Sequence, residues 1–182
     1  MCASVLFSPT KAFEDAFHNA DLKGAFGIVL IAGILMALAS YFVLGNIYVS
    51  LYFFVLNIVE WLIFSGFVWF FEFIHVRKKK RLAGVSYEQC LSVVGKLWAI
   101  NLVASLVFAF TAFLGPVVGS GLLIFLGILF ILCSIILTIA WLVASYKMLK
   151  VVLGVNGMKL VLNWIMLTVL YGLTMGIILS VL

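Results

Sequence analysis

The sequence predicts an all-α integral membrane protein in which a short amphipathic helix precedes five transmembrane helices, with the N-terminus inside and the C-terminus outside. The first observation is composition: 67% of the 182 residues are hydrophobic and only 9% are charged. The second is a series of apolar runs long enough to cross a bilayer. The third is the confinement of basic residues to alternate connections. A mean hydropathy of +1.37 is far above soluble usage, so lipid must cover most of the surface.

The first element is the segment 8–22, SPTKAFEDAFHNADL. Ser8 suits a helix N-cap and Pro9 suits the first turn, so we expect a short interfacial helix. Its apolar side chains share one face, and most of the other face is acidic or polar: Glu14, Asp15, His18 and Asp21. Two interpretations stay open for that polar face. It packs under the inner ends of the spans, or it docks a cytoplasmic partner.

Five apolar runs follow, each long enough for a transmembrane helix of about 20 residues. They are expected at about 24–44, 51–76, 90–114, 117–146 and 160–182 within a single membrane domain covering 1–182. The residues SYEQ at 86–89 fit the S-x-x-Q capping pattern and predict the start of the third long helix. Pro116 and its neighbouring glycines favour a tight hairpin between the third and fourth spans.

A basic stretch separates the second and third spans and consists of Arg77, Lys78, Lys79, Lys80 and Arg81. If the spans alternate, all eleven lysines and arginines fall on one side, which the positive-inside rule assigns to the cytoplasm. We therefore interpret the stretch first as a topology signal. Attraction to lipid head groups is expected too, at about 1 kcal/mol per cation. Nucleic acid is excluded as a partner because a short interhelical loop offers neither a groove nor aromatics for stacking.

Three polar residues are expected near the bilayer centre. Glu60 lies deep in the second span, Asn57 is three residues earlier, and Asn101 lies at a similar depth in the third span. An intramembrane carboxyl group is costly, so it faces the bundle interior or stays protonated. The cluster is either a proton or cation relay, or a protonated glutamate that hydrogen-bonds between helices. The sequence leaves these two readings open.

Two further pairs are predicted. Glu72 and Lys96 are expected at comparable depth near the inner boundary and could pair, although snorkelling explains Lys96 more simply. Gly172 and Gly176 form a GxxxG pattern in the last span. Such a pattern permits close helix contact either within the chain, which we favour, or between two copies of it.

Signals for catalysis or for a cofactor are missing from the sequence. Cys2, Cys90 and Cys133 lack CxxC spacing and only two histidines could join them, so we expect neither a metal site nor a cofactor. HExxH and GxSxG motifs do not occur, and the only aspartates, Asp15 and Asp21, precede the first span. We therefore expect a non-enzymatic protein.

Three segments resemble the Yip domain family, membrane proteins that in eukaryotes interact with Ypt/Rab GTPases. These segments are LFSPTKAFEDAF, LAGVSYEQCLSVVGKLWAINLVASLVF with its Gly95, and VVLGVNGMKLVLNWIMLTVL. The resemblance covers most of the chain. Because the region before the first span is shorter than in eukaryotic members, it implies a prokaryotic plasma-membrane relative.

The resemblance implies a membrane-organising or trafficking-like adaptor that acts through its cytoplasmic face. Its partners would be membrane lipids, a membrane or cytoplasmic protein, or a second copy of the chain in a homo-oligomer. The alternative is a small transporter or channel, or a subunit of one, that uses Glu60.

Overall fold

The computed structural model describes residues 5, 7–79, 85–115 and 120–181. The predicted fold class is confirmed: the described residues form a short N-terminal helix followed by five long apolar helices that can each span a membrane. The helices are α2 (Pro9–His18), α3 (Leu22–Leu44), α4 (Ile47–Lys79), α5 (Tyr87–Leu114), α6 (Ser120–Leu153) and α7 (Met158–Val181).

Local hydrogen bonds explain where two of the helices begin. Asn46 Oδ1 accepts from the backbone N–H of Tyr48 at 2.9 Å and of Val49 at 3.3 Å, which starts α4 four residues before the apolar run suggests. The start of α5 is the predicted capping box. Ser86 Oγ accepts from the Gln89 N–H at 3.2 Å, and Gln89 Oε1 accepts from the Ser86 N–H at 2.9 Å.

Helix α6 is longer at its C-terminal end than the hydropathy indicates. It continues past Tyr146 to Leu153 and stops at Gly154, whose φ of 57° is left-handed; Gly157, with φ of 66°, precedes α7. Glycine adopts this conformation without the steric cost that a Cβ brings, which lets the chain reverse between α6 and α7. The hairpin expected around Pro116 lies outside the described residues.

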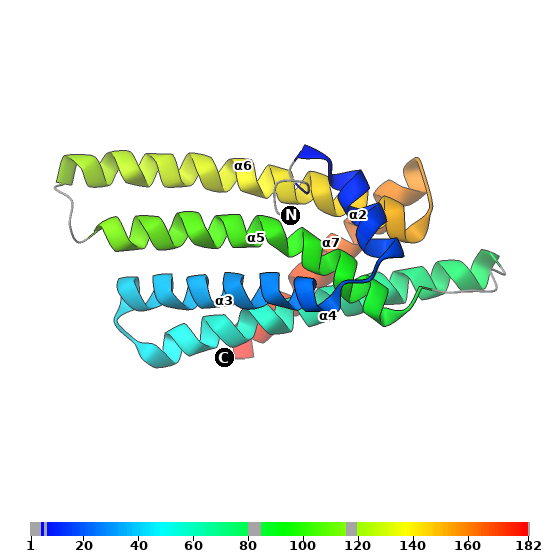
Figure 1. The fold of residues 1–182 in the computed structure, drawn as a ribbon, viewed down its shortest axis with the longest axis horizontal. Helices are drawn as coiled ribbons and strands as arrows, with labels where there is room; N and C mark the ends of the chain where they lie inside the picture. Colours follow the sequence, from blue (N-terminus) through cyan, green and yellow to red (C-terminus); the bar gives the residue numbers. More distant parts are fainter. Residues whose placement is uncertain (1–4, 6, 80–84, 116–119, 182) are drawn as a thin grey trace.

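The long helices form an elongated bundle (Figure 1). One end, called the inner end here, carries α2, the C-terminal end of α4 and the turn between α6 and α7; the other, the outer end, carries the turn between α3 and α4. Helix α2 crosses the inner end and contacts α5 and α6. The described connections that hold Lys and Arg therefore gather at one end, as the charge pattern predicts.

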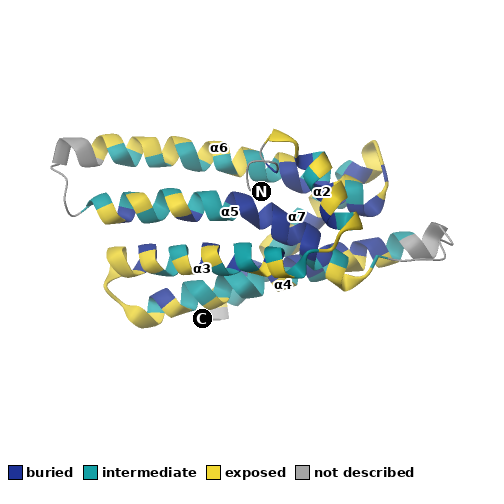
Figure 2. Ribbon diagram, in the orientation of Figure 1, coloured by how far each residue is buried: buried dark blue, intermediate teal, exposed yellow. Residues whose placement is uncertain are grey.

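The core is concentrated in the inner part of α5, where residues 90 and 92–100 are all buried (Figure 2). Helix α3 makes its closest approach to α5 there. A Cβ built on Gly95 would overlap the Ala25 side chain and lie 2.9 Å from Ala25 Cα, so the crossing requires glycine at 95. Trp98, Leu97 and Phe64 are among the fully buried side chains beside this crossing.

Candidate functional site

The interfacial helix α2 is fastened to the bundle through both packing and hydrogen bonds. Phe13 and Ala16 are buried in the core cluster. The Gln89 side chain donates from Nε2 to the Phe17 carbonyl at 3.1 Å, and the Asp21 N–H donates to Ser92 Oγ at 3.0 Å. Two side chains of α5 thus hold the end of α2 and the turn that follows it.

The four residues of the predicted polar face differ in their exposure and contacts. Glu14, Asp15 and His18 are exposed, and Asp15 accepts a hydrogen bond from Asn19 Nδ2 at 3.0 Å. Asp21 is only partly exposed, and its Oδ1 caps α3 by accepting from the Gly24 N–H at 2.8 Å. The exposed surface of Glu14, Asp15 and His18 is called the α2 outer face below.

Lys96 is buried on α5, and its ammonium Nζ lies 4.0 Å from Asp21 Oδ2. The carboxylate it approaches therefore belongs to the turn before α3, which the sequence pattern does not reveal. Glu72 is buried as well, on α4. The expected pairing of Glu72 with Lys96 stays a prediction. The buried cation thus lies near a carboxylate of the turn between α2 and α3, so Asp21 links that turn to α5.

The three polar residues expected at the bilayer centre do not hydrogen-bond to one another. Asn57 donates from Nδ2 to the Val29 carbonyl at 2.9 Å and accepts from Trp98 Nε1 at 3.2 Å. Both ends of its amide are therefore engaged by α3 and α5. Residues three apart on a helix point about 60° apart, which allows Asn57 and Glu60 to face different neighbours.

Asn101 lies at a different feature, a cavity of about 370 Å³ between α5, α6 and α7, and Glu60 is not among the residues that line it. Residues lining it are Ile100, Asn101, Ala104, Ser134, Leu137, Thr138, Trp141 and Tyr171. The Glu60 carboxyl interacts electrostatically with the Tyr171 hydroxyl, and the Tyr171 ring packs edge-on against Phe64 at 5.1 Å. These lining residues are called the mid-membrane cavity below, and Glu60 of α4 neighbours it through Tyr171.

Some polar groups at the mid-membrane cavity form hydrogen bonds within the protein and others do not. Thr138 Oγ1 donates to the Ser134 carbonyl and Ser134 Oγ donates to the Phe130 carbonyl, each at 2.8 Å. Among the described residues, no hydrogen bond or ion pair engages the Asn101 amide, the Glu60 carboxyl or the Tyr171 hydroxyl. The cavity can therefore offer both donors and acceptors to a polar guest.

The glycines of the GxxxG pattern do not pack against another helix of this chain. Both Gly172 and Gly176 are exposed, and a Cβ on either would meet open space among the described residues. The expectation of an intrachain contact is therefore wrong, because α7 turns this face away from its neighbours. Contact with a second copy remains the other interpretation.

The basic stretch is described in part. Arg77, Lys78 and Lys79 are the last residues of α4, beyond the apolar span that ends at His75. Lys80 and Arg81 lie outside the described residues. The second span therefore continues as helix into the cationic segment.

Sequence reasoning missed several hydrogen bonds that join helices at the inner end. Asn163 of α7 donates to His75 Nε2 at 3.2 Å, which leaves His75 Nδ1 to donate to the Phe71 carbonyl at 2.9 Å. Trp164 Nε1 donates to Ser145 Oγ at 3.0 Å and so joins α7 to α6. The sequence shows only that polar and indole side chains lie near the helix ends. Which of them hydrogen-bond to one another depends on how each helix is rotated about its axis.

Fold and site together define a multi-pass α-helical membrane protein with a short amphipathic helix across its inner end and a partly polar cavity between α5, α6 and α7. Comparisons with protein-family models, with curated proteins and with solved structures found no match.

Proposed function

We propose that this protein is a non-enzymatic membrane-organising adaptor that presents the α2 outer face to a basic surface of a cytoplasmic partner. The observation that carries the proposal is the docking of α2. Phe13 and Ala16 fix one side of the helix in the core, so that the carboxylates of Glu14 and Asp15 stay in water beside His18. Carboxylates held on a rigid helix complement a cationic partner surface and favour its encounter.

The resemblance of three segments to the Yip domain family supports the same proposal. Two of these segments, LFSPTKAFEDAF and the one with Ser86, Gln89 and Gly95, meet where α2 and α3 contact α5. A Yip-type adaptor of a prokaryotic plasma membrane would use this cytoplasmic corner. Membrane lipids, and a second copy of the chain, are further proposed partners.

A photo-crosslinking amino acid at His18 tests the adaptor proposal in intact cells. The expected result is a crosslink to one cytoplasmic protein that disappears in the variant Glu14→Lys/Asp15→Lys, since both side chains are exposed and the reversal leaves the core intact. The matched control is Lys11→Glu, a charge reversal at another exposed position of α2. Crosslinks that persist unchanged after the double reversal would contradict the proposal.

A second function is favoured by the mid-membrane cavity. A small transporter or channel would pass protons or cations through Glu60, Asn101 and Tyr171, because unengaged polar groups inside a bundle mark ion and proton paths. Asn57 is not part of this path, since both ends of its amide are engaged.

Flux into sealed liposomes separates the second function from the first. Glu60→Gln would abolish proton flux while the protein stays folded, and Glu88→Gln, at an exposed carboxylate where α5 starts, would leave it unchanged. Flux that is absent from the wild type, or equal in both variants, would remove the transporter function.

A further inference from the structure

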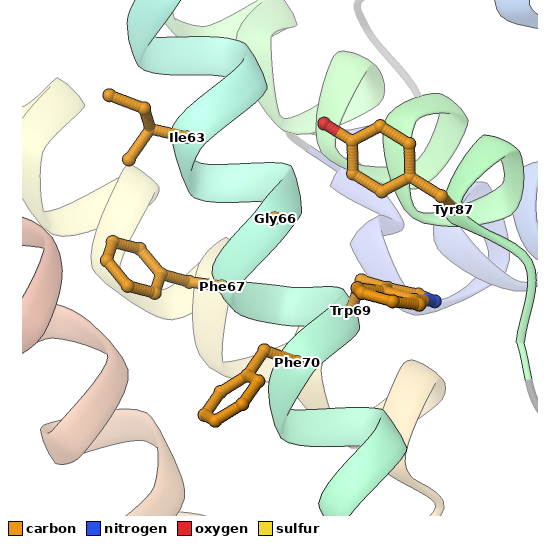
Figure 3. A pocket seen from close by; sticks show the side chains of 6 residues that line it. All are labelled: Ile63, Gly66, Phe67, Trp69, Phe70 and Tyr87. Carbon is orange, nitrogen blue, oxygen red and sulfur yellow. The ribbon is translucent and has the colours of Figure 1, made fainter.

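A groove runs along the inner half of α4, where the N-terminal end of α5 lies beside it (Figure 3). Its volume is about 780 Å³, and it is lined by Ile63, Gly66, Phe67, Trp69, Phe70 and Tyr87. The Tyr87 hydroxyl, a polar group of the lining, donates to the Leu62 carbonyl at 3.2 Å. The groove therefore offers a guest an almost wholly apolar surface.

Gly66 gives the groove its depth. A Cβ at this position would meet open space, and the aromatic side chains of the groove stand on either side of it (Figure 3). Phe67 and Phe70 form one wall; Trp69 and Tyr87, with ring centroids 6.2 Å apart and nearly perpendicular, form the other. Such a slot between rings accepts a hydrocarbon chain.

The register of α4 aligns this slot with the cationic segment. Gly66, Phe70, Phe73 and Arg77 are spaced by four, three and four residues, so they share one face of an uninterrupted helix. Seven residues separate Phe70 from Arg77, a rise of about 10 Å. Lys78 and Lys79 follow directly, beyond the end of the apolar span at His75.

We propose that this groove binds one acyl chain of an anionic phospholipid from the inner leaflet, with the lipid phosphate at the level of residues 77–79. The head-group layer on each side of a bilayer is roughly 5–8 Å thick. A lipid whose chain passes Phe70 therefore has its phosphate near the helical turn that carries Arg77. The groove holds the acyl chain in place, and the cations favour an anionic head group over a neutral one. The site therefore differs from the general attraction of a basic loop to anionic lipid.

The site goes beyond the adaptor proposal, because neither the α2 outer face nor the mid-membrane cavity contributes to it. It also differs from the topology signal. Fixing orientation requires cations on one side of the membrane only, whereas a lipid site requires the slot at Gly66 and the cationic turn that begins at Arg77 to lie one above the other along α4.

Native mass spectrometry of the full chain tests the proposal. Detergent-solubilised protein is offered equal amounts of phosphatidylglycerol and phosphatidylcholine with identical acyl chains. The wild type is expected to retain one phosphatidylglycerol in preference to phosphatidylcholine. Gly66→Leu, which fills the slot, is expected to lose the bound lipid. The control Gly172→Leu, at another glycine with open space around it, is expected to keep it.

A charge variant tests the selectivity separately. Arg77→Gln/Lys78→Gln/Lys79→Gln leaves Lys80, Arg81 and the other basic connections to hold the orientation. Since each surface cation contributes roughly fivefold to anionic lipid binding, the preference is expected to fall at least about tenfold, while an acyl chain still occupies the groove.

Quenching of tryptophan fluorescence by lipids with brominated chains gives a readout that does not depend on the Gly66→Leu variant. Brominated phosphatidylglycerol is expected to quench the wild type more than brominated phosphatidylcholine does, and the difference is expected to vanish in Trp69→Phe. Equal quenching by the two lipids overturns the proposal. So does equal lipid retention by Gly66→Leu and Gly172→Leu.

Discussion

The inner and outer halves of the bundle are built differently, although the same long apolar helices run through both. In the inner half, α2, α3, α4 and α6 surround a stretch of α5 that is buried almost without interruption. In the outer half, α6 exposes Ile124, Phe125, Ile131 and Ile135 to the surroundings (Figure 2). Hydropathy therefore does not determine which half is packed.

Close approach and hydrogen bonding account for the difference. Lipid chains solvate leucine as well as another helix does, so helices associate in a membrane through small residues and interhelical polar contacts. The inner half has the Gly95–Ala25 crossing and the hydrogen bonds of Asn57, Trp61 and Gln89 to neighbouring segments. In the outer half, Thr111 and Thr174 each donate to a carbonyl of their own helix rather than to a neighbouring one.

The largest expected effect is at the crossing of α3 and α5. Gly95→Ala places a methyl group against Ala25, so the helices must separate, and we expect a loss of about 1–3 kcal/mol of unfolding free energy. Reversible unfolding in mixed detergent and SDS measures it. Gly172→Ala is the control, because its methyl group meets open space. Equal stability of the two variants would show that the crossing is not tight.

Asn57→Leu is expected to have the next largest effect. It removes the hydrogen bonds to Val29 and Trp98 and leaves the Trp98 indole N–H without its acceptor. Interhelical hydrogen bonds of this kind contribute about 1 kcal/mol, which the same unfolding assay resolves. Asn101→Leu serves as a comparison, since no residue in the described part of the chain hydrogen-bonds to its amide. A loss as large as that of Asn57→Leu would argue against the hydrogen bonds assigned to Asn57.

A smaller effect is expected at the turn between α2 and α3. Asp21→Ala removes the α3 cap and the charge near Lys96, whereas Asp21→Asn keeps a capping side chain and removes only the charge. We expect about 1 kcal/mol for the alanine variant and less for the asparagine variant. Thermal unfolding of both variants separates capping from charge. If both lose the same stability, the charge contact dominates.

The smallest effect is expected in the outer half. Gly172→Leu/Gly176→Leu should leave unfolding unchanged to within about 0.5 kcal/mol, because both positions are exposed. Chemical crosslinking in native membranes then reports separately on self-association. Loss of a crosslinked dimer in this variant would assign the GxxxG face to a homo-oligomer. A drop in stability would instead indicate an intrachain contact.

The sequence predicted the features that depend on composition or on a local pattern. The five apolar helices follow from bilayer thickness, and the capping box at Ser86 follows from residues three apart. It did not predict the end of α6, because hydropathy falls at Lys147 and Lys150 while the backbone stays helical until Gly154. A lysine makes that part of a helix favour water over lipid but leaves the backbone helical. A glycine in the left-handed conformation ends the helix itself.

The partners of the polar residues could not be predicted from the sequence. Residue spacing gives depth along a helix, which is why Asn57 and Asn101 were both expected near the bilayer centre. Partners depend on how each helix is rotated and on close crossings such as that of Gly95 with Ala25. The same limit applies to Asp21, whose neighbour Lys96 lies 75 positions away in the chain.

The clamp on α2 also constrains the order of events during biosynthesis. Gln89 and Ser92, which hold Phe17 and Asp21, belong to the third span, and α6, which α2 also contacts, emerges later still. A nascent chain therefore cannot seat α2 until α5, and then α6, has been inserted into the membrane. A segment synthesised before the spans is thus among the last to reach its final place.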